Sequence, residues 1–207
     1  MLGARVPAAD ITADGAIIRN GNTVGFGGSE SVLFARRDGS SVRINGATVT
    51  EADIMADNGI IHAIDQVLTP PTVVDVATYV PTFSSLVDNL MRADGDLPGA
   101  LSGAGPFTVF APTNTAFSET ATGDLSASRL AEVLQLHVVS GNVLAADLSD
   151  GDELTTLNGG SLTVGTNAAG NLTLTDPNGN TRTISSTTNN VQTANGVIHA
   201  IDGVLLD

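Results

Sequence analysis

The three histidines, His62, His137 and His199, are the side chains in this sequence best suited to chemistry. Imidazole is a common metal ligand and the usual general base near neutral pH. A metal site needs further His or Cys ligands at suitable spacing, but the chain contains no Cys and no two of its histidines stand at such a spacing. We therefore expect structural, hydrogen-bonded histidines and no metal or other cofactor.

The sequence also lacks the patterns expected of a serine hydrolase and of an EF-hand calcium site. The chain is rich in Ser and Asp, yet it has no Gly-x-Ser-x-Gly elbow, and its histidines stand in apolar stretches, which disfavours a Ser-His-Asp hydrolase. The segment that starts at Asp176 resembles an EF-hand loop, but Thr181 occupies the sixth position and Thr187 the twelfth, where Gly and Glu are needed. We expect a turn at Asp176 and no enzyme activity.

An eleven-residue stretch that occurs twice organises the chain. Residues 58–68 and 195–205 differ at two of eleven positions and are offset by 137 residues. Residues 6–10 and 143–147 form a second matching pair at the same offset. Two matches at one offset indicate a tandem duplication of a domain-sized unit. The chain therefore holds one and a half units.

The repeated stretch has the pattern of a buried strand. It begins with an Asn-Gly turn and continues with apolar, mostly β-branched residues. Side chains alternate along a strand, so His199 and Asp202 point to opposite faces, as do His62 and Asp65. We expect each of these polar groups to form a hydrogen bond that fixes a neighbouring loop.

The first unit, residues 1–70, reads as short strands with little helix. Turn signals stand at Asn20-Gly21, Asp38-Gly39 and Asn45-Gly46, and the Pro pair after Thr69 makes a short linker. Several apolar residues near its end have no predicted helical layer to cover them, so an exposed patch that favours association is expected. These are Ile54, Ile60, Ile61, Ile64 and Val67.

The second unit, residues 71–207, reads as helices followed by strands. Apolar periodicity predicts helices over 83–91 and 126–137, and residues 94–105 read either as a loop or as a short helix around 97–101. A strand is expected from residue 107, followed by a short helix that Thr113 or Asn114 caps. From residue 154 onward the chain is β-like, so the fold class is α+β.

Three motifs resemble the signatures of the fasciclin domain family. The repeated Asn-Gly-Val-Ile-His-Ala-Ile-Asp is similar to its C-terminal motif, residues 107–117 to its first motif, and residues 134–139 to its central Tyr-His motif, with Leu136 in place of Tyr. The resemblance implies a helical layer packed on a twisted β-sheet wedge. It also implies one complete domain in 71–207, the C-terminal half of a domain in 1–70, and an architectural role for the motif side chains His62, Asp65, Thr113, Asn114, His199 and Asp202.

The same resemblance implies adhesion contacts. In animal members, an Asp-Ile pair before the C-terminal motif and the residues beside Tyr-His are implicated in integrin binding. Asp53-Ile54 and Leu136-His137 occupy those places here, whereas the second unit has Asn190-Val191 in place of Asp-Ile. An ordinary strand-edge pair remains the alternative reading of Asp53-Ile54.

Composition limits the partners. The formal net charge is −14, and the eight basic residues are all Arg, so the surface repels nucleic acid and anionic lipid. No apolar run approaches the ~18 residues needed to span a membrane, so no membrane insertion is expected. The acidic, lysine-free composition favours a bacterial source.

The expected function is that of a non-enzymatic adhesion module, either secreted, periplasmic or at the cell surface. It would bind other proteins or matrix components through many weak contacts, and residues 1–70 would add self-association. The alternative is a domain that binds a small apolar ligand or a glycan between the helical layer and the sheet.

Overall fold

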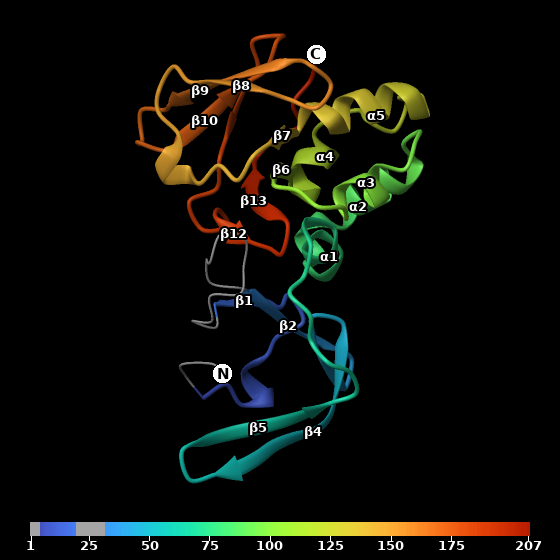
Figure 1. Ribbon diagram of the computed structural model, residues 1–207, viewed down its shortest axis with the longest axis vertical. Coiled ribbons are helices and arrows are strands. Elements are labelled where there is room, and N and C mark those ends of the chain that lie inside the picture. Colours follow the sequence, from blue (N-terminus) through green and yellow to red (C-terminus); the bar gives the residue numbers. More distant parts are fainter. Residues whose placement is uncertain (1–4, 20–31) are drawn as a thin grey trace.

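The computed structural model describes residues 5–19 and 32–207 (Figure 1). The first unit forms one antiparallel sheet whose five strands follow in chain order, after a short 3-10 turn, η1 (Ala8–Asp10). The strands are β1 (Ala16–Arg19), β2 (Val32–Asp38), β3 (Ser41–Ile44), β4 (Ala47–Ala56) and β5 (Gly59–Ile64). The predicted turns at Asp38-Gly39 and Asn45-Gly46 are confirmed, whereas Asn20-Gly21 lies outside the described residues.

Helices open the second unit, as predicted. They are α1 (Val73–Tyr79), η3 (Pro81–Phe83), α2 (Ser84–Arg92), α3 (Leu97–Leu101), α4 (Asn114–Ser118) and α5 (Ala127–Leu136). Thr113 caps α4 and Ser126 caps α5 through their hydroxyl oxygens. Helix α1 was not predicted, although Thr72 and Asp75 form a capping box at its start.

Two four-stranded sheets complete the second unit. One has the order β12 (Val191–Gln192), β13 (Gly196–Ile201), β6 (Phe107–Pro112) and β7 (Val138–Ser140), and its central pair, β13 and β6, is parallel. The other is antiparallel, with the order β11 (Thr181–Thr183), β10 (Leu172–Thr175), β9 (Ser161–Thr166) and β8 (Glu153–Thr155). The predicted α+β class is confirmed.

Helix α1 joins the two units. Its residues Val73 and Val76 belong to one buried cluster with Phe34 of β2 and Ile198 of β13. Figure 1 shows α1 between the first sheet and the rest of the second unit, with the β4–β5 hairpin at the far end of the molecule. One face of the first sheet therefore packs on its neighbour, while β5 lies away from it.

Candidate functional site

The repeated histidines make the same hydrogen bonds in both units. The Nε2–H of His62 donates to the carbonyl oxygen of Val6 at 3.0 Å, and that of His199 donates to Val143 at 2.9 Å. In each ring Nδ1 accepts a backbone N–H at 3.3 Å, from Asp53 in the first unit and from Asn190 in the second. These bonds tie the repeated strand to two loops.

Asp53 and Asn190 complete this arrangement in equivalent ways. Both residues have positive φ, 58° and 52°, in the left-handed region that Asp and Asn tolerate. A side-chain oxygen of Asp53 accepts the N–H of Ala8 at 3.0 Å, and one of Asn190 accepts the N–H of Ala145 at 2.8 Å. An amide in the second unit thus does what a carboxylate does in the first.

The third histidine, His137, holds the end of the chain. It is buried at the C-terminus of α5, where its Nδ1–H donates to the Val133 carbonyl oxygen at 2.7 Å. Its Nε2 accepts the N–H of Leu205 at 3.0 Å. Burial lowers the pKa of His137 to about 4, so the ring is neutral near pH 7.

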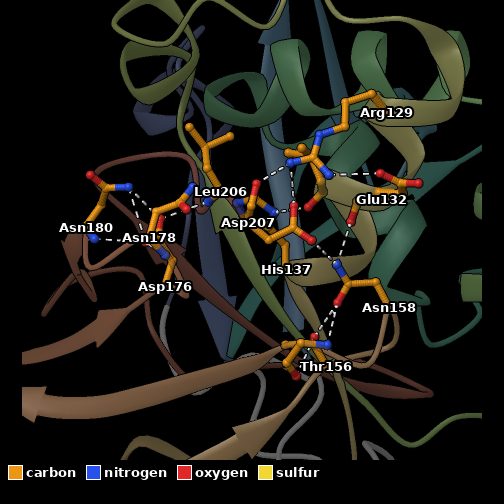
Figure 2. Close-up of polar contacts among 12 residues, drawn as sticks. Arg129, Glu132, His137, Thr156, Asn158, Asp176, Asn178, Asn180, Leu206 and Asp207 are labelled. Atoms are coloured by element: carbon orange, nitrogen blue, oxygen red, sulfur yellow. Dashed lines mark hydrogen bonds and ion pairs between the residues drawn. The ribbon is translucent and has the colours of Figure 1, made fainter.

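Further polar contacts fix residues 206–207 beside His137, as Figure 2 shows. The buried carboxylate of Asp176 accepts the N–H of Leu206 at 2.9 Å. The carboxylate of Asp207 lies 2.8 Å from the Arg129 guanidinium and accepts a hydrogen bond from the Asn158 amide at 3.0 Å. The turn predicted at Asp176 is present, but its role in holding the C-terminal segment was not predicted.

These contacts leave no imidazole nitrogen available for chemistry. All six ring nitrogens of His62, His137 and His199 are bonded to backbone groups. Within residues 5–19 and 32–207, no group of three His, Asp or Glu side chains is placed to hold a metal ion. A general base or metal ligand would have to break one of these structural bonds first.

The other motif side chains also bind backbone groups. A carboxylate oxygen of Asp65 accepts the N–H of Thr48 at 2.8 Å, and one of Asp202 accepts the N–H of Thr183 at 2.7 Å. The side-chain oxygen of Asn114 accepts the N–H of Ser85 at 2.9 Å and thereby joins α4 to α2.

Asn195, predicted only as a turn residue, connects the helical layer to β13. Its side-chain oxygen accepts the N–H of Val73 at 2.9 Å, and its amide donates to the carbonyl oxygens of Leu101 and Gly103, each at 2.8 Å. Its partners lie about a hundred residues away in sequence, so local pattern carried no signal for this role.

Three of the five exposed large apolar side chains among the described residues belong to the first unit, and the other two, Met91 and Leu157, belong to the second. Met55, Ile61 and Val67 are 68%, 55% and 88% exposed, while Ile198 and Val204, at the positions equivalent to Ile61 and Val67, are 1% and 0% exposed. Ile54, Ile60 and Ile64 are half-buried. The second unit thus covers side chains that the first unit leaves open.

The predicted contact residues have different environments. Asp53 is exposed and Ile54 half-buried on β4. Leu136 and His137, in contrast, are 0% and 1% exposed, because the last turn of α5 packs between the sheets. A partner cannot touch these two side chains while the domain is closed, so we correct that part of the contact surface and retain Asp53-Ile54.

The two units also differ in their interiors. A cavity of about 450 Å³ opens on the first unit, lined by apolar side chains together with Arg5, Asn58 and His62. The pocket beneath the helices of the second unit measures only about 20 Å³. No helix in the described part of the chain is both long and apolar enough to cross a membrane.

Comparisons with known proteins agree on one family. The Fasciclin domain model matches residues 3–70 and 81–207. The chain is 37% identical over 142 residues to protein sll1483 of Synechocystis sp., covering 65% of this chain and 73% of that protein. It is 30% identical over 198 residues to a fasciclin-like arabinogalactan protein of Arthroderma benhamiae, covering 89% of this chain and 44% of that one.

Human periostin is 30% identical over 181 residues, covering 80% of this chain and 20% of periostin, so the chain spans a small part of that relative. Among solved structures, a FAS1 domain pair from the insect cell adhesion molecule Fasciclin I has a TM-score of 0.60 and 22% identity. The likeness covers 100% of this chain and 77% of that one, and it shows a shared fold.

Proposed function

Because the chain belongs to the fasciclin domain family, we propose that it is a non-enzymatic adhesion module that binds other proteins or matrix components. We also propose that residues 71–207 form a complete domain and residues 1–70 the C-terminal half of another. A secreted, periplasmic or cell-surface location fits such a role. The insect relative of the same fold is a cell adhesion molecule, which supports this reading.

The observation that carries the proposal is the open surface of the first unit. Asp53 is exposed on the β4–β5 hairpin, where Met55 and Ile61 are exposed as well, and this mixture of one charge with apolar area suits a weak protein contact. The histidines, in contrast, are fully engaged by backbone groups, which supports the absence of catalysis. Weak single contacts become effective adhesion when several copies act together.

Adhesion by coated beads tests the proposal. Beads carrying the chain at graded densities are applied to surfaces coated with the chain itself or with a mixture of matrix proteins. Binding is expected to rise steeply with density, because multivalent attachment depends on the number of simultaneous contacts. Beads that bind neither surface at any density would contradict the proposal.

Asp53→Asn identifies the contact residue. The second unit makes the same hydrogen bond with Asn190, so the fold should be unchanged while one surface charge is lost. Loss of a charge-assisted contact worth ~1 kcal/mol should weaken each attachment about fivefold. Asp57→Asn, which removes an exposed carboxylate from the neighbouring turn, serves as the control and should bind like the wild type.

The cavity in the first unit favours one second candidate, the binding of a small apolar ligand. Its volume of about 450 Å³ and its apolar wall with a few polar groups suit such a molecule. Saturable binding of an apolar fluorescent dye, lost when Ile18 is changed to Asp in a protein that remains folded, would support this candidate. Dye binding that Ile18→Asp leaves unchanged would place the dye elsewhere.

A further inference from the structure

Two arginines stand directly opposite each other in the first sheet, since Arg36 of β2 pairs with Arg43 of β3. Like charges at such opposite positions repel each other and lower the stability of a sheet. The chain has only eight basic residues against 22 acidic ones, so this pair concentrates a scarce positive charge. A locally unfavourable choice of this kind is typical of a functional site.

The two arginines line a pocket between the first sheet and helix α1. Its volume is about 190 Å³, and its wall consists of Phe34, Arg36, Arg43, Gly46, Thr78 and Tyr79. The ring of Tyr79 lies against the turn after β3, where a Cβ on Gly46 would be 3.2 Å from its Cε1. Guanidinium groups beside aromatic rings suit a ligand that combines an anionic group with a ring.

This pocket is separate from the cavity beside β5. Side chains alternate along β2, so Arg36 faces α1 while Ala35 lines the cavity on the other face of the sheet. Counted from the turn, the pair that corresponds to Arg36 and Arg43 in the β10–β11 hairpin is Thr173 with Thr183. The arginine pair is therefore a property of the contact between the first sheet and α1 and not of the repeat.

Hydrogen-bond donors outnumber acceptors around the pocket. A carboxylate oxygen of Asp38 lies 3.2 Å from Nε of Arg43 and 3.9 Å from Nη2 of Arg36. The Nε–H of Arg43 is not aligned with that oxygen for a hydrogen bond, and Nδ2 of Asn45, in the adjoining turn, has no acceptor among the described residues. Both of these buried groups are N–H donors, which favours a ligand that brings acceptors.

The charges around the pocket match a ligand with one negative charge. Two guanidinium groups share the carboxylate of Asp38, which is 53% exposed and therefore pairs with them only weakly. Burial, with a smaller contribution from Asp75, raises the pKa of Tyr79. The phenol thus keeps its proton near pH 7 and can donate a hydrogen bond to an anion.

We propose that the pocket between β2, β3 and α1 binds a uronic acid residue of an acidic polysaccharide. The carboxylate of the sugar lies between Arg36 and Arg43, whose planar guanidinium groups match its two oxygens, and the sugar ring lies against Tyr79. The small volume suits one sugar ring. The inference rests on the proposed function, since it names the class of matrix component that the module binds.

The tyrosine emission of the full chain tests the proposal. The chain has one Tyr and no Trp, so this emission comes from Tyr79 alone. Trigalacturonate is titrated into the protein at low ionic strength, where charge contacts are least screened. We expect a saturable change of emission with one trimer bound per chain. The methyl-esterified trimer has the same rings without the charge, and it should bind at least about tenfold more weakly.

Three variants locate the site. Arg36→Gln removes one guanidinium group and should weaken trigalacturonate binding about tenfold. Arg5→Gln removes the same charge from the cavity on the other face of the sheet and should bind like the wild type. Asp38→Asn removes the carboxylate that competes for both arginines and should tighten binding about threefold. A misfolded protein could not give this gain.

The proposal is overturned if trigalacturonate causes no saturable change up to tens of millimolar. It is also overturned if the esterified trimer binds equally well, or if Arg36→Gln and Asp38→Asn both leave the affinity unchanged. A glutamate peptide that binds as tightly as the trimer would overturn the assignment to a sugar. Bead adhesion that depends on Asp53 without any trigalacturonate binding would remove this inference and leave the proposed function standing.

Discussion

At the scale of single residues, each histidine is held in one tautomer by backbone groups. His62 and His199 carry their proton on Nε2, and His137 carries its proton on Nδ1. A second proton on His137 must go to Nε2, where it would displace the N–H of Leu205. Burial opposes that charge as well, and it lowers the pKa of His199 in the same way.

Stability should therefore fall in mild acid through His137. The pKa of His137 is lowered from 6.5 to about 4 by folding, so its contribution is complete above pH 6.5 and is lost as the pH falls toward 4. His137→Gln retains a hydrogen-bonding side chain but does not titrate. Between pH 7 and pH 4 the wild type should lose about 3 kcal/mol more of its free energy of unfolding than this variant loses. Urea denaturation at several pH values measures the difference, and parallel losses would show that His137 is not the titrating group.

The roles of some of these residues were predictable from the sequence, and those of others were not. The apolar run around His199 and Asp202 predicted that these polar side chains would be hydrogen-bonded, because it marks a buried strand, and both make such bonds. The burial of Leu136 and the contacts of Asn195 depend on elements far away in sequence, so local pattern could not supply them.

At the scale of elements, the parallel contact between β6 and β13 closes the second unit. The strands approach so closely at Gly196 that only a residue without a side chain fits against the Phe107 carbonyl oxygen. The equivalent position in the first unit, Gly59, is free of such contact.

Matched alanine substitutions should thus have unequal effects. Gly196→Ala should destabilise the second unit by about 3 kcal/mol, since the new methyl group forces the two backbones apart. Gly59→Ala should change the free energy of unfolding by less than about 0.5 kcal/mol. Urea denaturation of both variants beside the wild type gives the comparison, and similar losses for the two would mean that β5 is covered in solution.

Apolar periodicity made α2 and α5 predictable, and in α5 the capping residue Ser126 also marks the start of the helix. Helix α1 was missed because its seven residues follow a Pro pair, a signal for a linker. The capping pair of Thr72 and Asp75 is the sequence signal that indicates the start of α1.

At the scale of the whole molecule, both units contain the repeated strand, but the helical layer occurs once in the described part of the chain. The helices follow the first sheet in sequence, and they pack with β13 in the second unit. Through α1 the layer also covers the Phe34 face of the first sheet but leaves β5 open. The packing of α1 against both units had no signature in the sequence.

Hydrogen–deuterium exchange of β5 and β13 in the same molecule tests this account most directly. The two strands have nearly the same sequence, so their unprotected amides exchange at nearly the same rate, and each strand serves as the reference for the other. The account predicts strong protection throughout residues 196–201 and, in residues 59–64, rapid exchange at the amides that face the open edge, because these have no partner strand. Equal protection of the two strands would show that the edge of β5 is covered, and it would contradict the claim that this edge of the first sheet is open.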